Sequence, residues 1–177
     1  RNLDAELSTL NFDQIKQKAE QAWNLELGKV KVEGTEQDKT VFYTALYHSK
    51  HTPRLFSDVD GRYPGFAEDP QIYTANGFDY YCDFSLWDTF RAAMPLHALL
   101  ESKRTGHMMQ SLTKKAEQGG WMPIFPCWNQ YTAAMIGDHV ASVVADAYAK
   151  GIRNFDVQSA YQYLRKNAFE ANKDPKS

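Results

Sequence analysis

The chain has 177 residues, of which 43% are hydrophobic, 24% charged and 14% aromatic, and its formal net charge is −2. This composition suits one folded domain with its own core and excludes a chain that is disordered throughout. The near-neutral charge argues against a general nucleic-acid binder, and no apolar run is long enough for a transmembrane helix. No signal-peptide pattern is present. Because the chain begins Arg1-Asn2-Leu3, without Met, we expect a segment of a longer protein.

Apolar residues recur mostly at the helical period, which predicts an all-α chain of about six helices. Asn11 is placed to cap the first helix, and Gly28 lies just past its end. The second helix is predicted over residues 36–48. The third begins near Ser85 and continues to about residue 100, with a kink or a restart expected at Pro95.

A fourth, weaker helix is predicted around residues 108–116, and Asp156 is expected to cap the sixth. The fifth is predicted over residues 132–150, with an apolar face so broad that the helix should be nearly surrounded. Its apolar face consists of Met135, Ile136, His139, Val140, Val143, Val144 and Ala147. Only short segments, such as residues 29–32, are predicted as strands.

The composition is rich in rings, with ten Tyr, ten Phe and four Trp. Many of them lie in residues 52–84, which we expect to be a long ordered loop, and more lie in residues 119–131. Aromatic side chains in polar loops indicate a surface that stacks on flat ligands such as sugars or nucleobases. The lack of a positively charged surface favours sugars. The alternative is that the rings fill a large core. Cys82 and Cys127 form no metal motif, so one disulfide and two free thiols both stay open.

The first polar cluster combines two carboxylates, Asp58 and Asp60, with a glycine and Arg62. A helix-loop-helix calcium loop is excluded, because Phe56 occupies the position of its first acidic ligand. Two interpretations stay open. One is an Asx turn with Arg62 paired to an aspartate, and the other is a polar rim that binds substrate hydroxyls.

The second cluster places Trp87 and Asp88 at the start of a helix, with Ser85 as its N-cap. A carboxylate there complements the helix dipole, and Arg91, one turn later, is positioned to pair with it. The same arrangement also suits a sugar site, in which the Trp87 ring stacks on a pyranose and Asp88 binds two hydroxyls.

The third cluster leads into the predicted fifth helix. Tyr131 and Asp138 are seven residues apart, which on a helix places them on one face. His139 shares the apolar face and is expected to be a core residue. Asn129, Gln130 and Tyr131 precede the helix and are able to point into a site.

Together and in this order, these clusters resemble glycoside hydrolase family 92, the calcium-dependent exo-acting α-mannosidases. The resemblance covers roughly residues 5–170. The stretches that carry it are 43–48, 56–63, 84–91, and 135–139 running into 145–148.

The resemblance implies an (α/α)6 toroid as the catalytic domain, preceded in the full protein by a β-sandwich. Such a toroid has twelve helices, so residues 1–177 would be its first half, without the sandwich and the later helices. The family hydrolyses α-mannosides with inversion, using a general acid, a carboxylate base and calcium. The family's base lies in a Gly-Asn-Asp-Asp-type motif that is not matched here, so we expect it beyond Ser177 and expect the isolated chain to be inactive.

At the family's general-acid position this sequence has Tyr131, with Gln130 before it, and neither is a carboxylic acid. Three explanations stay open: another acid enters from elsewhere, the protein only binds sugar, or the leaving group needs no proton. A phosphate monoester leaves readily as an anion, and family members that act on mannose linked through phosphate carry Gln where others carry Glu.

The resemblance implies as ligand an α-mannoside glycan, α-1,2-linked or linked through phosphate as a mannosyl phosphodiester, and as partner the rest of the same polypeptide. It also implies calcium, for which Asn129 and Gln130 are possible oxygen donors, and export to the periplasm, cell surface or medium. The alternative function is a non-catalytic mannoside-binding or assembly element. The expected substrate-binding residues are Trp87, Asp88, Asp58, Asp60, Arg91 and Asp138, with Tyr131 and Gln130 at or next to the general-acid position.

Overall fold

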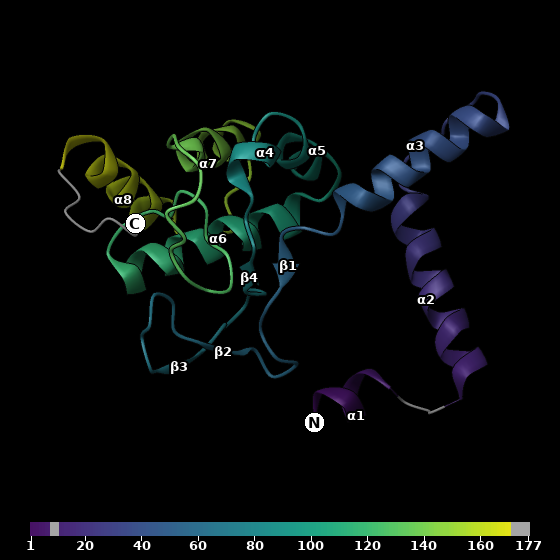
Figure 1. Cartoon of the computed structure of the whole chain (residues 1–177), viewed down its shortest axis with the longest axis horizontal. Coiled ribbons are helices and arrows are strands. Elements are labelled where there is room, and N and C mark those ends of the chain that lie inside the picture. The colour runs from purple at the N-terminus through teal and green to yellow at the C-terminus, as the bar shows by residue number, and fades with distance from the viewer. Residues whose placement is uncertain (8–10, 171–177) are drawn as a thin grey trace. The chain divides into compact units, whose positions relative to one another are not determined.

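The computed structural model describes residues 1–7 and 11–170, and the chain divides into two compact units at residues 51 and 52. The described residues form eight helices and four short strands (Figure 1). The predicted helical character is confirmed, but six helices was too low a count and four strands were missed. None of these helices combines the length and the apolar character that crossing a lipid bilayer requires.

The N-terminal unit contains α1 (Asn2–Glu6), α2 (Phe12–Leu27) and α3 (Glu36–Ser49). The predicted cap of α2 is confirmed, because the Asn11 side chain accepts a hydrogen bond from the Gln14 amide at 3.1 Å. Thr35 and Asp38 form a reciprocal capping box at the start of α3. The strand predicted over residues 29–32 is wrong: these residues form a turn and an extended connection to α3.

In the second unit, the predicted loop over residues 52–84 contains two antiparallel strand pairs. They are β1 (Arg54–Leu55) with β4 (Tyr81–Cys82), and β2 (Arg62–Pro64) with β3 (Ile72–Thr74). Between these strands the buried rings of Tyr63 and Tyr80 stack with their centroids 3.7 Å apart. The sequence suggested the rings of residues 52–84 as a sugar-stacking surface. Most of them are instead buried in the protein interior.

The helix predicted from Ser85 to residue 100 is divided into α4 (Leu86–Thr89) and α5 (Ala93–Leu100). The break lies at residues 90–92 rather than at Pro95, which occupies the first turn of α5. A proline is tolerated in the first turn, because the amide it lacks would have no helical partner there.

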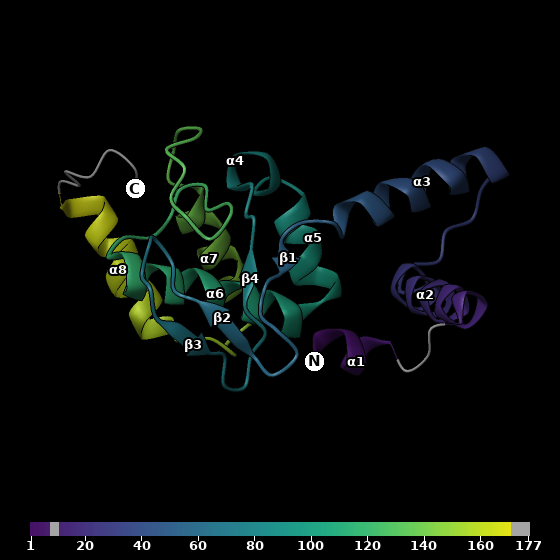
Figure 2. The ribbon, with the colours of Figure 1, turned by 60° about the horizontal axis from the view of Figure 1, so that its bottom comes forward.

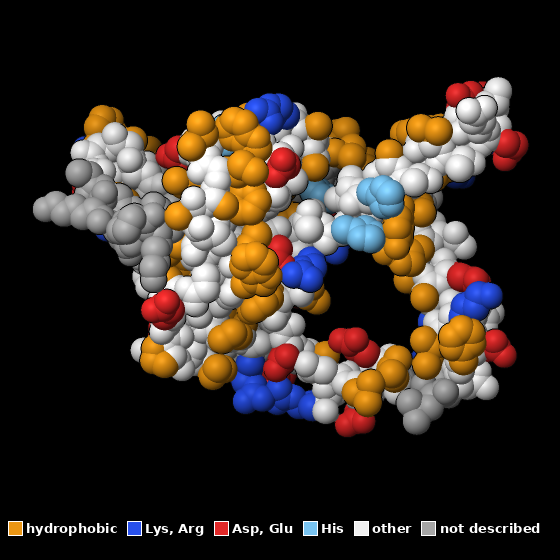
Figure 3. Space-filling view, in the orientation of Figure 1, with side chains coloured by type: hydrophobic (Ala, Val, Ile, Leu, Met, Phe, Trp, Pro, Cys, Tyr) orange, Lys and Arg blue, Asp and Glu red, His pale blue; other side chains and the backbone are white. Residues whose placement is uncertain are grey.

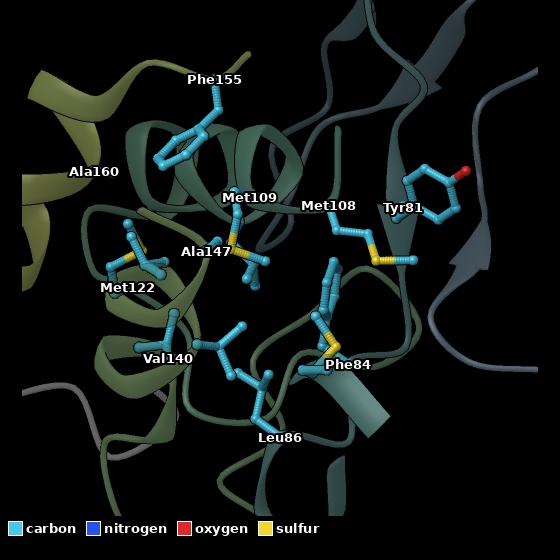
Figure 4. Close-up of a cluster of buried hydrophobic side chains, with 14 of the residues drawn as sticks. Tyr81, Phe84, Leu86, Met108, Met109, Met122, Val140, Ala147, Phe155 and Ala160 are labelled. Carbon is cyan, nitrogen blue, oxygen red and sulfur yellow. The ribbon is translucent and has the colours of Figure 1, made fainter. Parts of the chain in front are cut away.

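Helix α6 (Ser102–Gly119) forms the centre of this unit and packs against α5, β4, α7 (His139–Ala149) and α8 (Val157–Phe169). Gly120 ends it in a left-handed conformation, with φ of 87°. Figure 4 shows the side chains of α6 meeting those of α7 and the segment around α4. The fully buried members of this core include Met108, Met109, Leu112, Phe84, Leu86 and Val140.

Helix α7 starts at His139, seven residues later than predicted. The backbone before it is left-handed at Ala133 (φ 50°), Met135 (φ 62°) and Gly137 (φ 91°), and such residues interrupt a right-handed helix. Tyr131 and Asp138 therefore do not share a helix face, and that prediction is wrong. Val140, Val143, Val144 and Ala147 are buried as predicted, whereas Met135 and Ile136 are exposed.

Both cysteines are free thiols, so the second of the two alternatives for Cys82 and Cys127 holds. Asp156 caps α8 as predicted, accepting a hydrogen bond from the Ser159 amide at 2.9 Å.

We predict that Leu112→Ala lowers the free energy of unfolding by about 2–5 kcal/mol, because it leaves a cavity at the centre of the α6 core. Leu99→Ala is the matched control, since Leu99 is 74% exposed and its truncation should change stability by less than about 0.5 kcal/mol. Urea unfolding of this chain measures both. Equal losses in the two variants would contradict the assigned core.

Candidate functional site

The first part of the site is the junction between α4 and the start of α7. His139 stacks on the Phe90 ring with centroids 4.0 Å apart and lies 5.3 Å from the Trp87 ring. Its Nε2 atom is buried without a hydrogen-bond partner, so the predicted core histidine is packed but not hydrogen-bonded at that nitrogen. The contact fixes the place of the half-buried Trp87 relative to α7.

Asp88 is exposed and accepts a hydrogen bond from the Ser85 hydroxyl at 2.7 Å. The predicted pairing of Arg91 with Asp88 is not what forms. Arg91 instead donates to the Trp87 carbonyl at 2.8 Å and lies over the rings of Trp87 and Phe90. The Asp88 carboxylate is thus presented to solvent beside an aromatic ring, as a sugar-binding pair would be.

Asp138 immediately precedes His139 and therefore lies close to this junction. Partial burial raises the pKa of its carboxyl above the ordinary value, although a hydrogen bond with Asn167 opposes the shift. Asn167 is itself fixed by two hydrogen bonds to the Met122 backbone.

Tyr131 is directed to the end of α6. Its hydroxyl donates to the Trp121 carbonyl at 2.6 Å and accepts from the Trp121 amide at 3.1 Å. Gly119 makes this approach possible, because a Cβ at that position would lie 2.5 Å from the Tyr131 hydroxyl. The ring of Tyr131 packs edge-on against Phe66. The Tyr131 hydroxyl is therefore occupied by the protein backbone.

Gln130 differs from its neighbour. Its backbone amide bonds to the Cys127 carbonyl at 3.0 Å, closing a tight turn. Its side chain is half-buried and has no hydrogen bond to the described part of the protein. Of the two residues at or next to the predicted general-acid position, Gln130 is therefore the one whose side chain is not already hydrogen-bonded within the described protein.

Asn129 lies inside the protein, with 4% of its surface exposed. Its Oδ1 accepts hydrogen bonds from the Tyr80 hydroxyl at 2.8 Å and from Lys115 Nζ at 3.4 Å. Its Nδ2 donates to the carbonyls of Pro64 and Gly65, both at 2.9 Å. The amide of Asn129, named above as a possible calcium ligand, is thus fully engaged within the protein.

Lys115 is a buried amine of this region, with 0% of its surface exposed. Its Nζ donates to the Tyr81 carbonyl at 2.9 Å and lies 3.7 Å from the centroid of the Tyr80 ring. Burial lowers the pKa of this amine to about 7, against the influence of Cys82 and Asp83.

Asp83 holds the same loop from the other side. Its carboxylate accepts a hydrogen bond from the Trp128 amide at 2.9 Å and pairs with Arg54. Burial alone would raise the pKa of this carboxyl, but the Trp128 amide and Arg54 together lower it below its ordinary value.

The two aspartates of the first cluster form the predicted turn. The Arg62 backbone amide donates to the Asp60 carboxylate at 3.3 Å, which closes an Asx turn, and the Arg62 side chain pairs with the same carboxylate at 2.9 Å. Gly61 N donates to the Asp58 carbonyl at 2.8 Å. This turn leads directly into β2, and Figures 1 and 2 both show the β2–β3 pair on the opposite side of α6 from α4. The structure therefore does not bring Asp58 and Asp60 together with Trp87 and Asp88.

A cavity of about 840 Å³ lies beside the β2–β3 pair, lined also by α6 and by residues 154–155. Trp87, Asp88 and Tyr131 are not among its lining residues. It therefore does not provide a hollow that those three side chains would share.

The glycosyl hydrolase family 92 catalytic domain matches residues 1–177, the whole chain. The chain belongs to glycoside hydrolase family 92. This confirms the resemblance stated from the sequence. No curated protein matches the chain with significance.

Solved structures of the family superimpose closely on the chain. The family 92 α-mannosidase BT3965 from Bacteroides thetaiotaomicron, in complex with mannoimidazole, is 35% identical with a TM-score of 0.92. The family 92 inverting mannosidase BT2199 from the same organism is 28% identical with a TM-score of 0.89. Each match covers 98% of this chain but only 23% and 24% of the respective relative. The chain thus spans about a quarter of the length of these relatives.

Lys115, Tyr80 and Asp83 were missed as parts of the site. Lys115 follows Leu112 by three residues and Ser111 by four, so helical periodicity alone places it on the buried face. A lysine on such a face signals a buried polar network. No comparable pattern precedes Asp83, whose role depends on a loop far away in the sequence.

We predict that Asp83→Asn weakens the pH dependence of stability in acid. The carboxyl pKa is lowered in the folded state, so its stabilisation is present above the unfolded pKa of about 3.9 and is lost as the pH falls through the folded value. Urea unfolding between about pH 3 and pH 7 measures the effect. An unchanged pH dependence in the variant would show that Asp83 contributes nothing to it.

Proposed function

We propose that the protein containing this chain is a glycosidase that removes terminal α-mannose with inversion of configuration. The observation that carries this proposal is the match of the whole chain to the family 92 catalytic domain, together with 35% identity to an α-mannosidase solved with mannoimidazole. Inversion is supported by the relative BT2199, which is an inverting mannosidase. By family resemblance the full-length protein is exported and its catalytic domain is a toroid, of which this chain forms a part.

In this proposal the Trp87 ring stacks on the terminal mannose while Asp88 accepts hydrogen bonds from two of its hydroxyls. The exposed carboxylate held by Ser85 and the contacts of the Trp87 ring with Arg91 and His139 support these roles. Asp138 is the neighbouring acid with a raised pKa. The turn of Asp58 and Asp60 contributes only if other parts of the polypeptide bring substrate to it.

Gln130, rather than Tyr131, is proposed to face the departing group. The Tyr131 hydroxyl is already bonded to the Trp121 backbone, whereas the Gln130 side chain has no protein partner in the described residues. An amide donates a hydrogen bond but does not transfer a proton. We therefore propose that the substrate is a mannosyl phosphodiester, from which a phosphate monoester departs as an anion.

Gln130→Glu tests this assignment in the full-length protein. We expect the variant to gain hydrolysis of mannobiose by about 100-fold or more, since general acid catalysis contributes that much, and to lose activity on a mannosyl phosphodiester. Released mannose measures both activities. Tyr131→Phe is the control and should alter the substrate preference little. A wild-type protein that cuts only mannobiose would refute the leaving-group proposal.

Calcium is proposed from the family resemblance alone. Residues 1–7 and 11–170 contain no group of three or more His, Cys, Asp or Glu side chains that could hold a metal ion. Asn129 is fully engaged, which leaves Gln130 as the possible donor. We propose that the calcium ligands come mainly from the rest of the polypeptide, as does the carboxylate base.

Chelation of the full-length protein should therefore abolish mannose release, and added calcium should restore it, while magnesium should not because it prefers a smaller octahedral site. Mannose release before and after dialysis against a chelator measures this. Full activity in the chelator would remove calcium from the proposal.

The second candidate function is mannoside binding without turnover, or assembly, through the same residues. It is favoured by the absence of a carboxylic acid at positions 130 and 131. Saturable binding of mannosides by the full-length protein, with no mannose released from either substrate, would establish it in place of hydrolysis.

A further inference from the structure

The segment between α6 and α7 carries Gln130 and yet has almost no regular structure. Trp128 (φ 51°) and Asn129 (φ 58°) both have a left-handed backbone, a conformation that residues other than glycine adopt infrequently. Two successive residues keep this unfavourable backbone conformation only where contacts with the surrounding protein stabilise it. The contacts of Asn129 provide this stabilisation.

Four backbone groups of this segment are hydrogen-bonded to the strand region, by which we mean residues 54–84. Phe84 N donates to the Pro126 carbonyl at 3.0 Å, and Ala67 N donates to the Asn129 carbonyl at 3.3 Å. The Trp128 amide donates to the Asp83 carboxylate at 2.9 Å, and the Asn129 amide lies 3.2 Å from Cys82 Sγ.

The Asn129 side chain binds the same strand region through three hydrogen bonds, to Tyr80, Pro64 and Gly65, and a fourth joins it to Lys115 of α6. Lys115 adds the connection to α6, because its Nζ bonds at once to the Asn129 side chain and to the Tyr81 carbonyl of β4. Helix, strand and loop therefore meet at one buried amine.

We propose that Lys115, Tyr80 and Asn129 form a buried clamp that fixes the Trp128–Gln130 backbone, so that Lys115 is a positioning residue for Gln130. The predicted effect of the clamp on catalysis rests on the proposed function. Its predicted effect on the structure of the loop does not. Lys115 is completely buried and so is not placed to touch substrate. It acts through Asn129, the residue directly before Gln130.

The test compares Lys115→Met with Lys114→Met in the full-length protein. Methionine keeps an unbranched apolar side chain that is one atom shorter, and it lacks the buried amine. Lys114 is the neighbouring, half-buried lysine and pairs with Glu117 at 2.6 Å, outside the clamp. Tyr80→Phe is the second clamp variant and removes a single hydroxyl, so it keeps the test open where Lys115→Met fails to fold.

The first readout is hydrogen exchange of backbone amides, which needs no activity. We expect Lys115→Met and Tyr80→Phe to speed exchange in residues 127–130 while residues 105–113 of α6 keep their protection. Lys114→Met should change neither region. Unchanged exchange at 127–130 in both clamp variants, or equal loss of protection in α6, would overturn the clamp.

The second readout is the kinetics of mannose release. We expect Lys115→Met to lower kcat by about 100-fold with little change in KM, since a displaced catalytic contact acts mainly in the transition state. Faster loop exchange with unchanged kcat would overturn the positioning role. A wild-type protein without any turnover would instead refute the proposed function, and the exchange measurement would still decide the clamp.

Discussion

A buried amine cannot be left without acceptors, and this constraint connects the parts of the C-terminal unit. Lys115 points from α6 into the interior, where an unpaired polar group costs several kcal/mol. It is satisfied by the Tyr81 carbonyl of β4 and by the amide of Asn129. The irregular segment that follows α6 has the same need, because its own backbone groups lack helical partners. Those backbone groups bond to Ala67 and to residues 82–84, and the Asn129 side chain connects the segment to Lys115, so we attribute the fixed shape of the loop to both sets of bonds.

The helices that could be predicted are those whose limits depend on neighbouring residues. Asn11 and Asp156 cap α2 and α8 through the amide three residues later, which is a purely local contact. The failure at residues 132–138 has the opposite cause. Apolar residues continue at helical spacing through Met135 and Ile136, but the backbone there turns left-handed and exposes both. Periodicity records which side chains are apolar, and it contains no information on bonds to distant parts of the chain.

The same distinction applies to the candidate site. The position of Trp87 and Asp88 at a helix start was predictable, because the helix signals surround them. The partner of Arg91 was not, since the ring of Phe90 competes with Asp88 for the guanidinium. Nor could sequence separate Gln130 from Tyr131. That separation depends on the room left by Gly119 beside the end of α6.

In the proposed function, an amide at the position where the family resemblance places an acid changes what the site is suited to bind as well as what it catalyses. A glutamate beside the departing group would repel the negative charge of a phosphodiester unless it were protonated. Glutamine removes that repulsion at every pH and still donates a hydrogen bond to a phosphate oxygen. A neutral donor helps such a group only if it is held in place, because a hydrogen bond weakens steeply when its angle or distance is wrong. The proposed role of Gln130 therefore requires a fixed backbone at this position. The fully hydrogen-bonded Asn129, directly before Gln130, meets that requirement.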